Sequence, residues 1–271
     1  MSPLTGVSIR REWALGAATL VILVLISATV VVNGHASRTP TSHSSGKSPS
    51  PIAATTPSST SSRSLTSQQH AELQQSISRM RDLVQVKAAT SSLYPAVRAE
   101  ARRQPDLYAA ALVRQLLTQD HRTSRNELLA WVHSESAQST EPLVVGLTPV
   151  DLQSKLAVAS VQDGANGPSP VPSQSDWMAL ARRHGHTTVQ ISHVTEPVSW
   201  ASAVANGQIT DPGVTARQVD AEVTLHTIDH GKATTARYSM ALVVNLEGPP
   251  VRGGYGFVAA ITYNVAAMGR R

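Results

Sequence analysis

The sequence predicts an α+β protein: an N-terminal transmembrane helix and a disordered tether, then short helices packed on a curved antiparallel sheet that ends in a three-strand meander. Three observations predict it. Residues 14–32 are apolar and uncharged, a Ser/Thr/Pro-rich stretch follows, and apolar and polar residues alternate through most of residues 218–265. Because the helical patterns come before the strand patterns, we expect an α+β domain and not alternating βα units.

Residues 14–32 (ALGAATLVILVLISATVVV) predict a single membrane-spanning helix. These 19 residues carry no charge, and at ~1.5 Å per residue they approach the ~30 Å thickness of a bilayer's hydrocarbon core. Arg10 and Arg11 precede the run, and Trp13 stands where an interfacial aromatic residue is expected. This flank predicts a single-pass plasma-membrane protein with residues 1–13 in the cytoplasm and the C-terminal domain outside the cell.

A cleaved signal peptide is the alternative interpretation of the same run. Gly34 and Ala36 place small residues at the positions that a signal peptidase inspects, so that cleavage after Ala36 would release a secreted protein. The apolar stretch is longer than the ~7–15 residues usual for a signal peptide, which favours a retained anchor. Both interpretations export the rest of the chain.

Residues 33–65 predict a disordered linker. Positions 35–64 alone contain 11 Ser, 5 Thr and 4 Pro, a composition that cannot bury a core. Over residues 66–92 we expect a juxtamembrane amphipathic helix, because Leu73, Ile77 and Met80 recur at helical spacing. Its apolar stripe either docks on the protein's own domain or makes a homo-oligomer.

Residues 93–271 form the predicted extracytoplasmic α+β domain. Leucines between Leu107 and Leu117 predict one helix, and a capping box at residues 124–127 (SRNE) predicts the start of another. Residues 155–161 (KLAVASV) and 188–194 are expected to be strands. Between them, Ser175 and Asp176 are expected to cap a short helix.

The closing meander carries the clearest pattern in the chain. Its first strand alternates apolar and polar residues, a turn at residues 229–232 (DHGK) reverses the chain, and two further strands follow. The expected inward positions are Val219, Ala221, Val223 and Leu225 on the first strand, Tyr238, Met240, Leu242, Val244 and Leu246 on the second, and Tyr255, Phe257, Ala259, Ile261, Tyr263 and Val265 on the third.

Charge and composition exclude several function classes. The net charge of +5 is concentrated in residues 1–64, with five basic residues and one acid, whereas residues 65–271 carry 18 basic and 17 acidic residues. A nearly neutral folded part argues against nucleic-acid binding. The chain has no cysteine, which excludes disulfides, Cys-ligated metals and thiol catalysis. No catalytic motif stands out, so we expect no catalytic residues, no metal and no cofactor.

Two groups of residues are candidates for contacts with other proteins. The basic group lies in the helical half, and the polar group alternates with apolar residues on the first meander strand. They are Arg98, Arg102 and Arg103 in the first, and Gln218, Asp220 and Glu222 in the second. Tyr238, Tyr255 and Tyr263 are candidates for lining a small pocket.

The order of elements, the string Leu128-Leu129-Ala130-Trp131 and the closing string FVAAITY (257–263) carry a family resemblance. Over most of residues 100–267 the chain resembles the extracytoplasmic nuclear-transport-factor-like (cystatin-like) domains of Gram-positive envelope proteins. Two groups share this layout: scaffold subunits of conjugative type IV secretion machines, and membrane proteins associated with mammalian-cell-entry lipid transporters. Arg outnumbers Lys by 19 to 4, which suits a GC-rich actinobacterial-type genome.

The resemblance implies a non-catalytic scaffold protein, anchored in the lipid bilayer, that contacts other subunits of an envelope-spanning transfer or transport complex. An enzyme of the same cone-shaped fold, of the isomerase or dehydratase type, is the alternative. Such an enzyme needs an ionisable residue on the inward face of the sheet, and the three clear strands place only apolar residues and tyrosines there.

Overall fold

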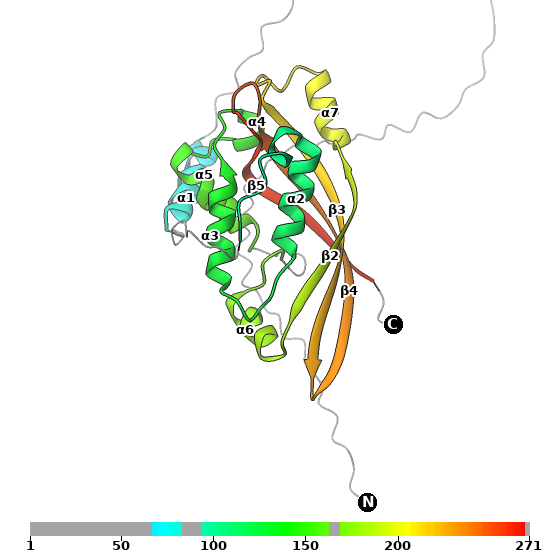
Figure 1. The fold of residues 1–271 in the computed structure, drawn as a ribbon. Helices are drawn as coiled ribbons and strands as arrows, with labels where there is room; N and C mark the ends of the chain where they lie inside the picture. Colours follow the sequence, from blue (N-terminus) through cyan, green and yellow to red (C-terminus); the bar gives the residue numbers. More distant parts are fainter. Residues whose placement is uncertain (1–66, 83–93, 163–168, 269–271) are drawn as a thin grey trace, which may run out of the picture.

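The computed structural model describes residues 67–82, 94–162 and 169–268 (Figure 1). The expectations for residues 1–13, 14–32 and 33–65, including Arg10, Arg11 and Trp13, lie outside the described residues. In the described part of the chain, no helix is long and apolar enough to cross a membrane. The fold is α+β, with helices packed on one five-stranded mixed sheet.

Eight helices and five strands follow one another along the described residues. The helices are α1 (Ser67–Asp82), the 3-10 helix η1 (Ala101–Arg103), α2 (Pro105–Leu117), α3 (Arg125–Glu135), α4 (Pro142–Val145), α5 (Val150–Ser160), α6 (Gln174–Arg182) and α7 (Val198–Ala205). The strands are β1 (Ser136–Ala137), β2 (His186–Thr195), β3 (Val214–Asp229), β4 (Lys232–Glu247) and β5 (Gly256–Met268).

The sheet has the order β1-β5-β4-β3-β2, and the four long strands pair antiparallel. The two-residue strand β1 pairs parallel with β5. The sheet is therefore mixed, and the expectation of a purely antiparallel sheet was wrong in this respect. A two-residue strand at the end of a helix leaves no alternation in the sequence by which it could be found.

The predicted strand at residues 155–161 is also wrong, because these residues lie mostly in helix α5. Leu152 and Leu156 are buried four residues apart, and Gln153 bonds through its side chain to both backbone groups of Ser139. The helical spacing of Leu152 and Leu156 begins before Lys155, so the apolar run of residues 155–161 taken alone did not indicate a helix. Short apolar runs fit a strand and a buried helix equally well.

The meander is confirmed. The hairpin joins β3 to β4 at the pair Asp229 and Lys232, and Val219 stands opposite Leu242 with both side chains buried. β5 departs from strict alternation at a bulge opposite Val244 and Leu246, where Ala259 adopts a φ of 57°. The bulge lets consecutive side chains of β5 face two different parts of the core.

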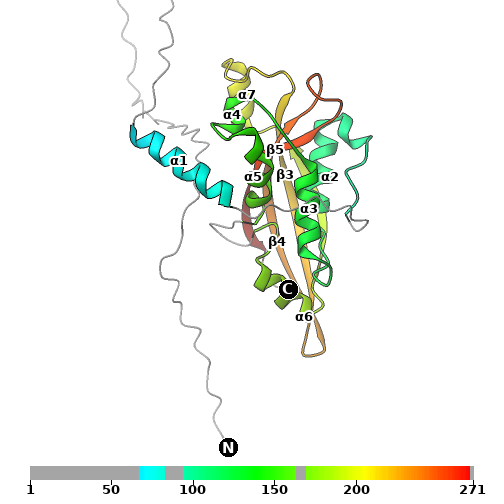
Figure 2. The ribbon, with the colours of Figure 1, turned by 90° about the vertical axis from the view of Figure 1, so that its left-hand side faces the viewer.

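The core has two clusters. The larger one joins α2 and α3 to the inner face of β3, β4 and β5. The smaller one holds Ile77 and Met80 of α1 against Leu152 and Leu156 of α5, together with residues of β1, β3, β5 and α7. Figure 2 shows α1 beside α5. Ile77 and Met80, two residues of the apolar stripe predicted for residues 66–92, thus dock on the protein's own domain.

Two predicted caps differ in detail from the structure. Ser124 precedes α3, but its side chain makes no capping hydrogen bond, and α3 is instead held by the packing of its buried residues. At α6 the capping residue is Ser173 and not Ser175: the Ser173 hydroxyl accepts a hydrogen bond from the backbone N–H of Asp176 at 3.2 Å. Both helices begin within two residues of the expected places.

Candidate interaction surface

The polar residues predicted on the first meander strand lie on one side of β3. Val219, Ala221 and Val223 point into the core, so the intervening residues project from the opposite face. We call this the outer sheet face: Gln218, Asp220, Glu222 and Thr224 of β3 with their strand neighbours Gln190 of β2 and Arg237 of β4. Alternation along β3 is sufficient to place the three predicted residues Gln218, Asp220 and Glu222 together.

The beginning of the same face is covered. Val214 and Ala216 alternate with Arg217, which forms an ion pair with Asp106 of α2 on the inner side. Val214 and Ala216 belong to the buried cluster that contains Trp200 of α7. The open part of the face therefore starts at Gln218, beyond the reach of α7.

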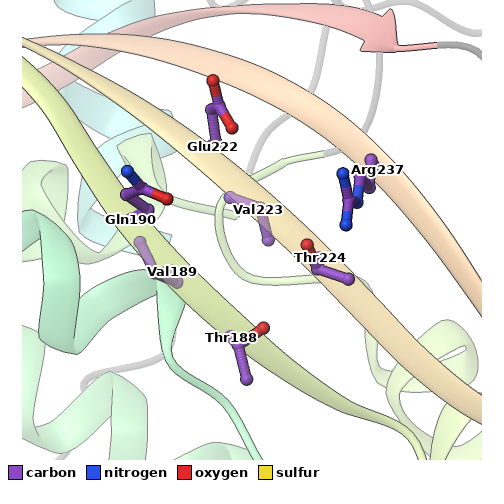
Figure 3. A pocket seen from close by; sticks show the side chains of 7 residues that line it. All are labelled: Thr188, Val189, Gln190, Glu222, Val223, Thr224 and Arg237. Carbon is purple, nitrogen blue, oxygen red and sulfur yellow. The ribbon is translucent and has the colours of Figure 1, made fainter.

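A shallow groove of about 310 Å³ crosses the open part. Its lining residues come from three neighbouring strands: Thr188, Val189, Gln190, Glu222, Val223, Thr224 and Arg237 (Figure 3). Gln190 stands opposite Glu222 across the β2–β3 ladder, and Thr224 stands opposite Arg237 across the β3–β4 ladder.

The charges along this groove are available for binding. Glu222 and Arg237 are both exposed, and among the described residues neither takes part in an ion pair. Gln218 donates a hydrogen bond to the Asp220 carboxylate at 3.0 Å, which orients that side chain. The groove thus offers an acid, a base and amide and hydroxyl groups to a polar partner.

The predicted basic group is divided by the structure. Arg98 and Arg103 are exposed. Arg102 instead points inward: its guanidinium donates to the Glu135 carboxylate at 2.5 Å and to the backbone carbonyls of Val97 and Tyr255. Its side chain is only 29% exposed, so most of its donors serve the fold and not a surface.

Glu135 is the centre of a buried polar network that joins four segments. One carboxylate oxygen accepts from the backbone N–H of Val97 at 3.0 Å, and the other accepts from Arg102 and from the Tyr108 hydroxyl at 3.0 Å. Burial, reinforced by the negative charge of Glu135, raises the pKa of Tyr108, so that Tyr108 stays a hydrogen-bond donor. Every oxygen of Glu135 is occupied, which makes this network a structural clamp.

Two further carboxylates are buried at the end of the domain that carries α4 and the β4–β5 connection. Glu141 accepts hydrogen bonds from the backbone N–H groups of Leu143, Thr210 and Asp211. Burial acts to raise the pKa of Glu141, but these amide hydrogen bonds outweigh it and leave the pKa lowered. The carboxylate therefore fastens the α7–β3 loop to the start of α4.

Glu247 is the exception among the buried acids. Its side chain is almost fully buried, and its Oε2 is the one buried side-chain polar atom of the described residues that has no hydrogen-bond partner. Burial, followed by the nearby charge of Asp211, raises the pKa of Glu247, although a hydrogen bond with Ser139 opposes the rise. Glu247 is thus the one buried acid of the described residues whose pKa is shifted upward.

The three candidate pocket tyrosines do not share one site. Tyr238 stands opposite Val223 in the register, whereas Tyr255 packs over Gly248 beyond the end of β4. Glu247 lies nine residue steps along β4 from Tyr238, or about 30 Å at ~3.3 Å per residue. Tyr263 lies between them, opposite Leu242. Burial raises the pKa of Tyr238 to about 12, as expected for a core tyrosine.

Sequence reasoning missed the buried acids Glu135, Glu141 and Glu247. Each had a weak signal. Glu135 ends helix α3 three residues after its apolar run LLAWV, and Glu141 directly precedes Pro142 at the start of a helix. Glu247 ends a long alternating strand. None of these signals identifies the partners, which come from distant parts of the chain.

Comparison of the chain with protein-family models, with curated proteins and with solved structures found no match. The function must therefore be argued from the sequence and from the geometry of the domain.

Proposed function

We propose that this chain is a single-pass, membrane-anchored assembly protein whose exported domain holds other subunits of an envelope-spanning transfer or transport complex. Residues 14–32 supply the anchor, the linker spaces the domain from the bilayer, and the outer sheet face supplies the contact surface. The family resemblance to conjugative secretion scaffolds and to lipid-transporter-associated membrane proteins supports the same class of function.

The observation that carries the proposal is the outer sheet face itself. Among the buried acids, Glu135 pairs with Arg102 and Glu141 is held by backbone amides, whereas Glu222 and Arg237 line a groove, are exposed and have no ion pair among the described residues. A polar surface that carries both acidic and basic groups suits a protein partner that presents the opposite charges. Complementary charges of this kind set the specificity and the rate of association.

The state of the buried acids favours binding over catalysis. Glu135 and Glu141 have both carboxylate oxygens engaged by hydrogen-bond donors of the fold, so both side chains serve the structure. The inner positions Val219, Ala221 and Val223 are apolar. An enzyme would need a titratable group exposed to its substrate.

One observation favours the alternative enzyme, namely the raised pKa and unpartnered oxygen of Glu247. Glu247 lines neither the groove on the outer sheet face nor the smaller groove of about 250 Å³ beside α6. A catalytic acid must reach a substrate, and the side chain of Glu247 is buried. Glu247 is therefore the residue to replace first if a catalytic activity is ever measured.

The experiment compares the tagged full chain with its Glu222→Lys variant in membranes of the host, extracted with mild detergent. We expect the wild-type chain to migrate on a native gel in an assembly that contains other proteins. Glu222→Lys should release most of the chain from this assembly while it stays in the membrane fraction. Glu100→Lys is the matched control, because Glu100 is also exposed but lies directly before η1 and not on the outer sheet face. An unchanged assembly in Glu222→Lys contradicts the proposal.

A further inference from the structure

Strand β2 ends the sheet, and most of its outer edge is open. The start of the strand is covered, since the backbone N–H of Thr187 donates to the carbonyl of Gln119 at 2.8 Å and His186 forms an isolated bridge with Asp120. After Thr187, no further backbone hydrogen bond to this edge is found among the described residues. On the other side of the sheet, the two-residue strand β1 pairs only with Phe257 and Val258 of β5.

The alternation of a strand shows which groups are free. Because the N–H of Thr187 points away from β3, the backbone groups of Val189 and Ile191 point the same way. A bulge at Ser192 then interrupts the ladder between β2 and β3. The regular open edge is thus a short window between the segment held by Gln119 and this bulge.

The window lacks the features by which proteins usually protect an edge strand. β2 is ten residues long and its sequence, HTTVQISHVT, contains no Asp, Glu, Lys, Arg or Pro. Charged side chains and prolines are the common means of preventing a second strand from pairing. Val189 and Ile191 are only half-buried, so apolar surface remains beside the open hydrogen-bonding groups.

We propose that β2 pairs antiparallel with β2 of a second copy of this chain, about a two-fold axis at Gln190. In this register Val189 stands opposite the second copy's Ile191, and the two such pairs exchange four backbone hydrogen bonds. Gln190 faces its own counterpart on the outer side. The two sheets then form one continuous sheet.

The same window explains why the occupant is a second copy. Two copies of a strand without Asp, Glu, Lys or Arg can pair without like-charge repulsion, whereas two identical charged strands would repel each other. The register is self-complementary around Gln190, and the half-buried Val189 and Ile191 cover one another's exposed surface. The pairing uses the edge of the sheet and so goes beyond the proposed function, which uses its outer face.

The absence of cysteine from the chain makes a clean test available. Residues opposite each other at a non-hydrogen-bonded antiparallel position have Cα atoms about 4.5 Å apart, within the range that a disulfide spans. We therefore expect the full-length Gln190→Cys variant, in membranes under mild oxidation, to form a disulfide-linked dimer in most of the chain. Asn264→Cys is the matched control, because Asn264 is exposed on β5, away from this edge.

A second measurement removes the dependence on disulfide formation. In detergent, light scattering after gel filtration should show wild-type chain and Asn264→Lys as dimers. Gln190→Lys, which places two lysines opposite each other, should weaken dimerisation at least tenfold while the chain still folds. Equal cross-linking of Gln190→Cys and Asn264→Cys overturns the inference. So does a Gln190→Cys adduct formed only with a different protein, which would make β2 a site for a foreign strand.

Discussion

Replacement of Glu135 by alanine tests the buried network most directly. Its carboxylate accepts from the Val97 amide, the Tyr108 hydroxyl and the Arg102 guanidinium, and so joins α2 and α3 to the segment before η1. Its own side chain is 1% exposed, whereas that of Arg102 is 29% exposed. Removal of the carboxylate therefore leaves the buried Val97 amide without an acceptor and the Tyr108 hydroxyl with only the backbone carbonyl of residue 135 at 3.3 Å, while Arg102 can turn partly toward water.

The magnitude follows from these contacts. A buried donor left without an acceptor costs about 1–3 kcal/mol, and removal of one partner of a buried ion pair costs about 3–5 kcal/mol. Because Arg102 regains some solvent, we expect Glu135→Ala to lower the free energy of unfolding by about 4 kcal/mol. Tyr108→Phe removes only one hydroxyl from the same network and should cost about 1 kcal/mol.

The assay is urea unfolding followed by tryptophan fluorescence. Trp131 lies in the same helix as Glu135, is 3% exposed and donates to the carbonyl of Pro95 beside Val97, so its emission reports this region. Glu100→Ala is the control. Glu100 is an exposed acid two residues before Arg102, and its replacement should change the free energy of unfolding by less than about 0.5 kcal/mol. If Glu135→Ala unfolds at the same urea concentration as Glu100→Ala, the network does not hold the fold as argued here.

Two further predictions concern the end of the domain that carries the β4–β5 connection. The pKa of Glu247 is raised in the folded state, so the stability that its protonated form supports is lost as the pH rises through that pKa. Glu247→Gln should therefore match the wild type near pH 4 and be more stable by about 1 kcal/mol at pH 7, in urea titrations at both pH values; an equal difference at the two pH values would refute this. At Gly248 an added Cβ would lie 2.3 Å from the Tyr255 ring, so Gly248→Ala should cost about 1–3 kcal/mol in thermal unfolding. Gly253→Ala, where the added Cβ meets nothing, should be near neutral, and equal effects of the two substitutions would contradict the packing described.

The sequence allowed good predictions where one strand's own alternation decides the outcome. Val219 and Ala221 are buried and Asp220 and Glu222 face outward, because successive side chains of a strand point to opposite faces. The same reasoning failed at residues 155–161, where a short apolar run is compatible with strand and helix. The local sequence pattern predicts which face of a strand a residue occupies more reliably than it predicts whether a short segment is a helix or a strand.

Features that depend on distant partners could not be predicted. Arg102 looked like a surface cation, and only the fold brings it to Glu135, 33 residues away, and to Tyr255 across 153 residues. Tyr238 and Tyr255 occupy expected inward positions, yet Tyr238 lies near the middle of β4 and Tyr255 packs beyond its end. Periodicity indicates which way a side chain points, but not how far along the sheet it lies from another.

The central claim is that the outer sheet face of an exported domain contacts other proteins. The most direct measurement uses Glu222→Cys in the cysteine-free chain, labelled on intact host cells with a membrane-impermeant thiol reagent that carries a photo-crosslinker. The account predicts that Glu222→Cys is labelled from outside and, after illumination, links to another protein. Glu100→Cys should be labelled equally but remain unlinked. Failure of the reagent to label either variant on intact cells, or labelled Glu222→Cys without any linked protein, would contradict the account.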